Sequence, residues 1–157
     1  MVALADSVLD LLREVKDPEL PMVDVVELGI VRDVRVTDDG VRVDITPTYT
    51  ACPAISMIKD DIVDMLTTHG FPNVTVRTVY SPAWTTDWMG EEAKEKLRAA
   101  GIAPPGRVDE QPLVMLHRAP RVVACPYCGS SDSEERSEFG STACKSIHYC
   151  NNCHQPF

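Results

Sequence analysis

Two C-x-x-C pairs near the C-terminus constrain the fold of this chain more than any other feature. Cys125 and Cys128 form the first pair, and Cys150 and Cys153 form the second. Each pair can present two thiolates from one tight turn, and two such turns facing each other supply a tetrahedral site for Zn²⁺. The surrounding segment, residues 122–157, has too few apolar side chains to sustain a core without a metal. We therefore predict a zinc-ribbon-like module, with an iron–sulfur cluster, which also takes four cysteines, as the alternative.

Three other residues of this segment could bind a metal. His148 and His154 could each replace one cysteine, but four thiolates already complete a tetrahedral sphere. We therefore expect both histidine side chains to be solvated. Cys144 is a fifth cysteine of the segment, and it could be an exchangeable extra ligand, a small buried apolar residue or an accidental thiol.

The sixth cysteine, Cys52, stands where a strand is predicted to give way to a helix. Residues 41–46 alternate apolar and charged side chains at the period of a half-buried strand, and residues 53–69 have helical periodicity. Pro53 suits the first helical turn, so Cys52 should lie at or next to the N-cap. There the helix dipole would lower its pKa below the free-thiol value of about 8.5. The alternative is that Cys52 is a small apolar residue closing the corner between strand and helix.

An acidic turn precedes this region. Residues 4–15 have the periodicity of an amphipathic helix, which should end by Lys16 because Asp17 precedes a proline. The turn that follows carries the carboxylates of Asp17 and Glu19. Both could simply cap backbone amides. If the turn instead folds over Cys52, the carboxylates oppose ionisation of the thiol unless a cation lies between them.

The remaining pattern predicts an α+β fold: a small two-layer domain with a mixed sheet of about three strands packed by helices. Residues 30–36 and 41–46 should form a hairpin through Asp39-Gly40, and residues 74–78 a third strand. Residues 81–89 contain both tryptophans in a loop that is either packed over the core or exposed for contact. Asp87 is expected to cap a further helix over residues 88–100.

The distribution of prolines predicts the domain boundaries. Four prolines lie in a stretch of little periodicity, namely Pro104, Pro105, Pro112 and Pro120. We expect residues 1–103 to form one domain, residues 104–121 a proline-rich linker, and residues 122–157 the metal-binding module. Few backbone hydrogen bonds should be shared between the two folded parts.

Charge and cysteine usage limit the classes of partner. The net charge is −9 and the sequence pI is about 4.8, so the chain lacks the basic surface that nucleic acid or an anionic membrane requires. The sequence shows no targeting signal and no apolar run long enough to cross a bilayer. We expect a cytoplasmic protein whose cysteines are ligands or reactive thiols, and whose partners are proteins or metals.

Two motifs resemble a known domain. Asp17-Pro18-Glu19 and the T-x-x-x-C-P sequence from Thr48 to Pro53 resemble the domain shared by SufT-like bacterial proteins and the eukaryotic cytosolic iron–sulfur assembly factors. Further blocks resemble the PaaD family, also called PaaJ, which belongs to the phenylacetyl-CoA epoxidase system. These blocks are residues 82–88, 101–105, 125–128 and 139–145. The resemblance to PaaD covers nearly the whole chain.

The resemblance implies a role in phenylacetate catabolism beside a multicomponent di-iron monooxygenase, the phenylacetyl-CoA 1,2-epoxidase. By this resemblance the chain is an accessory factor that helps to assemble iron or iron–sulfur centres, carries such a metal only transiently, and does not catalyse the epoxidation. Its partners would be other epoxidase subunits or iron–sulfur assembly proteins, or a second copy in a homodimer. The residues carried over are Cys52, Asp17, Glu19 and Thr48, while Cys144 lies in a block that matches the family.

Two other functions compete with maturation. The chain could be a structural subunit of the oxygenase, with residues 84–88 and the ribbon as its docking surfaces. It could also be a thiol-dependent enzyme using Cys52, but no histidine is placed to act as its base. His69 should lie at the far end of the predicted helix, roughly 25 Å away at 1.5 Å per residue.

Overall fold

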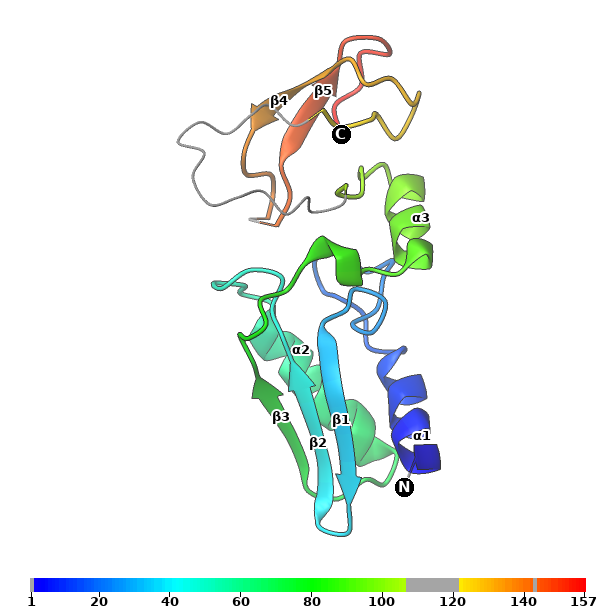
Figure 1. The fold of residues 1–157 in the computed structure, drawn as a ribbon, viewed down its shortest axis with the longest axis vertical. Coiled ribbons are helices and arrows are strands. Elements are labelled where there is room, and N and C mark those ends of the chain that lie inside the picture. The colour runs from blue at the N-terminus through cyan, green and yellow to red at the C-terminus, as the bar shows by residue number, and fades with distance from the viewer. Residues whose placement is uncertain (1, 107–121, 143) are drawn as a thin grey trace. The chain divides into compact units, whose positions relative to one another are not determined.

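The computed structural model describes residues 2–106, 122–142 and 144–157. The chain divides into two compact units, Met1–Ala93 and Lys94–Phe157. Figure 1 shows the elements, which in chain order are α1 (Val2–Leu12), β1 (Val31–Thr37), β2 (Gly40–Ile45), α2 (Ile55–Thr68), β3 (Val74–Thr78), the 3₁₀ helix η1 (Thr86–Trp88), α3 (Glu91–Ala99), β4 (Ser133–Ser137) and β5 (Ile147–Cys150). Among these described residues, no helix combines the length and apolar character needed to cross a membrane.

The first unit contains a mixed sheet in the order β1-β2-β3. Strands β1 and β2 pair antiparallel as the predicted hairpin, with Thr37 opposite Gly40 at its turn. Strand β3 pairs with β2 in parallel, because α2 carries the chain back along the sheet between them. The predicted α+β fold with a mixed three-stranded sheet is confirmed.

Alternation along β2 separates the two faces of this sheet. Val41, Val43 and Ile45 are buried against the layer in which α1 and α2 lie side by side (Figure 1). The helices contribute buried side chains to the same core, among them Val8, Leu12, Ile58, Ile62 and Leu66. Each fully buried aliphatic side chain stabilises the fold by about 1.5–3 kcal/mol. On the other face, Asp44 lies 3.5 Å from Arg42 and 3.8 Å from Arg77.

Helix α2 begins later than the sequence predicts. It starts at Ile55 with Ala54 as its N-cap, so Pro53 is not in the first helical turn and Cys52 lies two residues before the cap. Two consecutive turns replace the predicted start. The amide of Cys52 donates to the carbonyl of Tyr49 (3.2 Å), and the amide of Ile55 donates to the carbonyl of Cys52 (3.4 Å).

Helix α3 also begins later than predicted. Thr85, not Asp87, caps the short helix η1, because the hydroxyl of Thr85 accepts a hydrogen bond from the amide of Asp87. Met89 is then extended, and the amide of Gly90 donates to the carbonyl of Glu27 at 3.0 Å. This anchor to an earlier segment interrupts the predicted helix, and α3 starts at Glu91.

The second unit contains the antiparallel pair β4-β5, in which Ser133 is opposite Cys150. The C-terminal residue extends this pairing, because Phe157 and His148 exchange backbone hydrogen bonds of 2.8 and 3.0 Å. Most of the predicted linker, residues 107–121, lies outside the described residues, so the predicted bounds 1–103, 104–121 and 122–157 stay a prediction.

Candidate functional site

The four cysteines of the two C-x-x-C pairs meet at one point. Their Sγ atoms all lie within 4.8 Å of one another, with Cys125 3.6 Å from Cys153 and Cys128 3.6 Å from Cys150. Four sulfurs bound at about 2.3 Å around a tetrahedral zinc ion lie about 3.8 Å apart. The spacing and the all-sulfur donor set therefore fit a tetrahedral metal ion.

The two cysteine turns have the same backbone construction. In the first turn the amide of Gly129 donates to the carbonyl of Cys125 (2.9 Å), and in the second the amide of His154 donates to the carbonyl of Cys150 (3.0 Å). Gly129 and His154 both have positive φ, 73° and 59°. This conformation bends each chain so that both cysteines of a pair face the same point.

Electrostatics favours a cation at this point. Hydrogen bonds from the backbone of Ser130 and the side chain of Asn152 lower the pKa of Cys128 to about 6. Loss of hydration, together with the neighbouring sulfurs, raises the pKa of Cys153 to about 12. The raised pKa of Cys153 opposes its ionisation at neutral pH unless a metal ion compensates the charge.

The three other candidate metal ligands of residues 122–157 are not part of the four-cysteine cluster. His148 is 5% exposed, so the prediction that it is solvated is wrong: its ring stacks on Phe157 at a centroid distance of 5.5 Å. His154 is exposed, as predicted. Cys144 is also exposed, with its Sγ 3.2 Å from the hydroxyl of Thr142. It is therefore not a buried apolar residue, and it is not brought to the four cysteines.

Cys52 lies half-buried in the loop between β2 and α2. Burial raises the pKa of its thiol, backbone amides of Ala54 and Ile55 lower it, and the carboxylates of Glu19 and Asp17 raise it. The net direction is upward, so the predicted lowering by a helix N-terminus is wrong. The loss of hydration outweighs the two amides that point to the sulfur.

The charges of the acidic turn act on this thiol. Asp17 is buried, and its Oδ1 accepts hydrogen bonds from the amides of Glu19 (2.8 Å) and Leu20 (2.9 Å). Asp17 therefore caps backbone amides, in agreement with one of the two alternatives, and its charge also acts on Cys52. Glu19 is half-buried, and Thr48 is half-buried in the loop that carries Cys52.

Comparisons with known proteins assign both units. Residues 109–157 match a family described as the PaaD zinc beta ribbon domain, and residues 5–79 match one described as iron–sulfur cluster assembly protein. The chain is 42% identical over 147 residues to the D subunit of the putative 1,2-phenylacetyl-CoA epoxidase of Escherichia coli, covering 94% of this chain and 86% of that one. The chain belongs to the PaaD family.

The N-terminal unit of this PaaD protein has relatives of its own. It is 38% identical to the Fe-S protein maturation auxiliary factor YitW of Bacillus subtilis, covering 59% of this chain and 91% of that protein. A crystal structure of a domain of unknown function (DUF59) from Bacillus anthracis matches with a TM-score of 0.58 and 31% identity, over 61% of this chain and 92% of that one. The iron–sulfur assembly domain and the zinc ribbon that the sequence predicts are therefore the two domains that the family models match.

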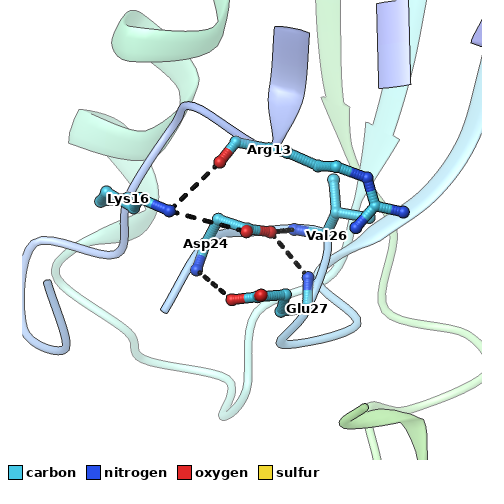
Figure 2. Close-up of polar contacts among 5 residues, drawn as sticks. All are labelled: Arg13, Lys16, Asp24, Val26 and Glu27. Atoms are coloured by element: carbon cyan, nitrogen blue, oxygen red, sulfur yellow. Dashed lines mark hydrogen bonds and ion pairs between the residues drawn. The ribbon is translucent and has the colours of Figure 1, made fainter. Parts of the chain in front are cut away.

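Sequence reasoning missed one buried carboxylate of this PaaD protein. Asp24 is 3% exposed, and burial raises its pKa. Its Oδ1 accepts hydrogen bonds from the amides of Val26 (2.9 Å) and Glu27 (2.8 Å), while its own amide donates to Oε2 of Glu27 (3.2 Å), as Figure 2 shows. This reciprocal arrangement has the hydrogen bonds of a capping box, although the residues that follow form a turn and not a helix. The signal is present in the sequence as Asp-x-x-Glu within an apolar stretch.

Proposed function

We propose that this protein is a cytoplasmic accessory factor of the phenylacetyl-CoA epoxidase system that assists the assembly of iron or iron–sulfur centres. The observation that carries the proposal is a half-buried Cys52 thiol whose pKa is raised by burial and by the charges of the Glu19 and Asp17 carboxylates. Thiolate and carboxylate together form a donor set for iron. The match of this unit to iron–sulfur cluster assembly proteins supports the same assignment.

The charges around Cys52 suit transient holding of a metal. Without a cation, burial and the two carboxylates keep the thiol protonated, so the site is only moderately reactive. An iron species would bind both carboxylates and replace the proton of the thiol. When the iron leaves, the thiol would take up a proton again. Iron is here the cargo of the protein, and Thr48, in the same loop, contributes to the same site.

The ribbon has a different part in the proposal. Cys125, Cys128, Cys150 and Cys153 would hold Zn²⁺ permanently, since a closed set of four thiolates is typical of structural zinc. The ion would supply folding stability to a segment with little core of its own. The module would then serve recognition of an epoxidase subunit or of an iron–sulfur assembly protein.

A purely structural role in the oxygenase has weaker support. That role assigns docking to the tryptophan loop, but both tryptophans are engaged within their own unit. Nε1 of Trp84 donates to the carbonyl of Leu28 at 2.9 Å, and the guanidinium of Arg32 lies 3.4 Å from the centre of the Trp88 ring. Both tryptophans are half-buried, whereas Ser81, Pro82, Ala83 and Asp87 of the same loop are exposed.

Complementation tests the proposal. In cells lacking the native copy, Cys52→Ser should abolish phenylacetyl-CoA epoxidation while sparing the fold and the zinc content of the protein. Cys144→Ser, which removes an exposed thiol outside both sites, is the matched control and should complement. Full complementation by Cys52→Ser would refute the metal-handling role. Co-purification at fixed ratio with active oxygenase would support a structural subunit instead.

A further inference from the structure

The C-terminal half of α2 and the segment that follows α1 line an open groove of about 550 Å³. Val15 and Met65 form its floor, since Val15 is buried and Met65 is half-buried. The other side chains that line it are exposed, and they are those of Glu14, Lys16, Asp61, Asp64, Thr68 and His69. The groove therefore has an apolar floor and a polar rim with three carboxylates.

Helical spacing explains the side of the groove that α2 contributes. Asp61, Asp64, Met65 and Thr68 follow one another at intervals of one to four residues that place them on one face of the helix. The core is packed by a different stripe of the same helix, namely Ile58, Ile62 and Leu66. Substitution of Asp61 or Asp64 therefore changes the groove and leaves the buried stripe intact.

The three carboxylates of the rim have no basic partner in the part of the chain that the structure describes. Other aspartates of this unit are ion-paired, among them Asp24 with a lysine and Asp44 with two arginines. Within the described residues, no ion pair joins Glu14, Asp61 or Asp64 to a lysine or an arginine. Asp61 and Asp64 also repel each other, because like charges three residues apart on a helix are neighbours.

The two basic side chains of the rim are bonded within the unit. Nζ of Lys16 lies 3.7 Å from Oδ2 of Asp24 and donates to the carbonyl of Arg13 at 3.2 Å, as Figure 2 shows. Nδ1 of His69 lies 2.8 Å from the carbonyl oxygen of Met65. The groove consequently keeps an excess of negative charge beside its apolar floor.

We propose that this groove is a docking site for a segment of a partner protein that presents arginine or lysine beside an apolar side chain. The cation would pair with the carboxylates of Asp61 and Asp64, and the apolar side chain would cover Met65. Charge complementarity favours this occupant over an acidic segment, and the apolar floor favours a peptide over a free cation. The described lining includes no residue of the Cys52 loop or of the ribbon, so the proposal goes beyond the metal-handling role and does not depend on it.

NMR of the full chain with ¹³C-labelled methionine methyl groups tests this docking. The probe is a blocked peptide of four Leu-Arg-Gly repeats. Its addition should shift the Met65 methyl signal, whereas the signal of Met57 should stay in place, because Met57 is an exposed residue of the same helix that does not line the groove. Salt at about 1 M, where the Debye length falls to about 3 Å, should weaken the binding.

Two double substitutions of equal charge provide the matched variants. Asp61→Asn/Asp64→Asn removes two charges from the rim, and because exposed ion pairs contribute modestly, binding should weaken about fivefold. Asp10→Asn/Asp60→Asn removes the same charge from exposed aspartates of α1 and α2 that do not line the groove. This control should bind the peptide as the parent protein does. All four side chains are exposed, so both variants should fold.

Two further peptides separate the charge from the apolar contact. Glutamate in place of arginine should abolish the Met65 shift, since it would face the carboxylates of the rim. Serine in place of leucine should weaken binding, because nothing apolar then covers Met65. Equal binding of the serine and leucine peptides would contradict the apolar contact and overturn the proposal.

The remaining outcomes are equally decisive. An unmoved Met65 signal in the folded parent protein would overturn the proposal, as would equal shifts of Met57 and Met65. Equal weakening by the two double variants would reduce the effect to net charge and overturn it as well. A Met65 shift that follows protein concentration without peptide would assign the groove to a second copy of this chain instead of a basic partner.

Discussion

Gly129 and His154 occupy equivalent positions in the two cysteine turns, each following the second cysteine of its pair with a left-handed φ of 73° or 59°. Glycine adopts this conformation without steric cost, whereas a residue with a Cβ pays about 1–2 kcal/mol. Gly129 therefore suits the left-handed conformation of its turn better than His154 does. The second turn holds a histidine in the same left-handed conformation.

This relationship predicts opposite effects of two substitutions. Gly129→Ala should lower the free energy of unfolding of the metal-loaded ribbon by about 1–2 kcal/mol, and His154→Gly should raise it by up to about 1 kcal/mol. Thermal melting followed through zinc release measures both. Gly106→Ala is the control, because open space surrounds a Cβ there and no left-handed φ is needed. Equal destabilisation by Gly129→Ala and Gly106→Ala would contradict the argument.

The metal content of cysteine variants should distinguish the four-cysteine cluster from the thiol of Cys144. Cys150 is fully buried and its Sγ lies within 4.8 Å of the other three, so Cys150→Ser should remove the bound metal and the cooperative melting of the ribbon. Cys144→Ser should retain about one zinc per chain. Elemental analysis gives the ratio. Visible sulfur-to-iron absorption that Cys150→Ser abolishes, with no zinc present, would replace zinc by an iron–sulfur cluster.

The first domain should fold without the ribbon. The core residues of the sheet and of α1 and α2 all precede residue 94, and the predicted boundary follows residue 103. A truncated chain ending at residue 103 should stay soluble and melt in one cooperative transition, measured by circular dichroism. A non-cooperative melt, or aggregation of that shortened chain, would show that residues beyond 103 complete its core.

Elements defined by local periodicity could be predicted from the sequence. Alternation along residues 41–46 and the Asp39-Gly40 turn give the β1-β2 hairpin, and the paired C-x-x-C motifs give the four-sulfur cluster. In each case the residues that decide the structure are close in sequence or uniquely suited to one chemistry. Sequence reasoning places the start of α2 too early, because Pro53 fits a helix start and a preceding turn equally well.

Features set by distant contacts are not predictable in this way. The sequence favours a solvated His148, but pairing of the C-terminal residue with β5 brings the Phe157 ring over it. The late start of α3 depends on Gly90 bonding to Glu27, far away in the chain. The pKa of Cys52 depends on how deeply the loop is buried, which no local pattern reports. The sequence gives the effect of the acidic turn on Cys52 only conditionally: the carboxylates oppose ionisation of the thiol if the turn folds over it.

The last prediction concerns the pH dependence of Cys52. Burial is the largest of the causes that raise its pKa, and the charge of Glu19 has a larger effect than that of Asp17. Alkylation of the metal-free Cys52 site should therefore be half-maximal at a higher pH than alkylation of a free cysteine peptide, whose thiol has a pKa of about 8.5. Glu19→Gln should lower this midpoint more than Asp17→Asn does, and Asp44→Asn, on the opposite face of the sheet, should not change it.

The same shift has a defined effect on stability. Because the folded state holds the thiol proton more tightly than the unfolded state, the stability contribution of the neutral thiol is complete below the unfolded pKa and is lost as pH rises toward the folded pKa. Cys52→Ser should flatten this alkaline decline in denaturant melts performed at a series of pH values. An alkylation midpoint at or below that of the free thiol would contradict both expectations, since it would mean that the amides of Ala54 and Ile55 outweigh burial and the two carboxylates.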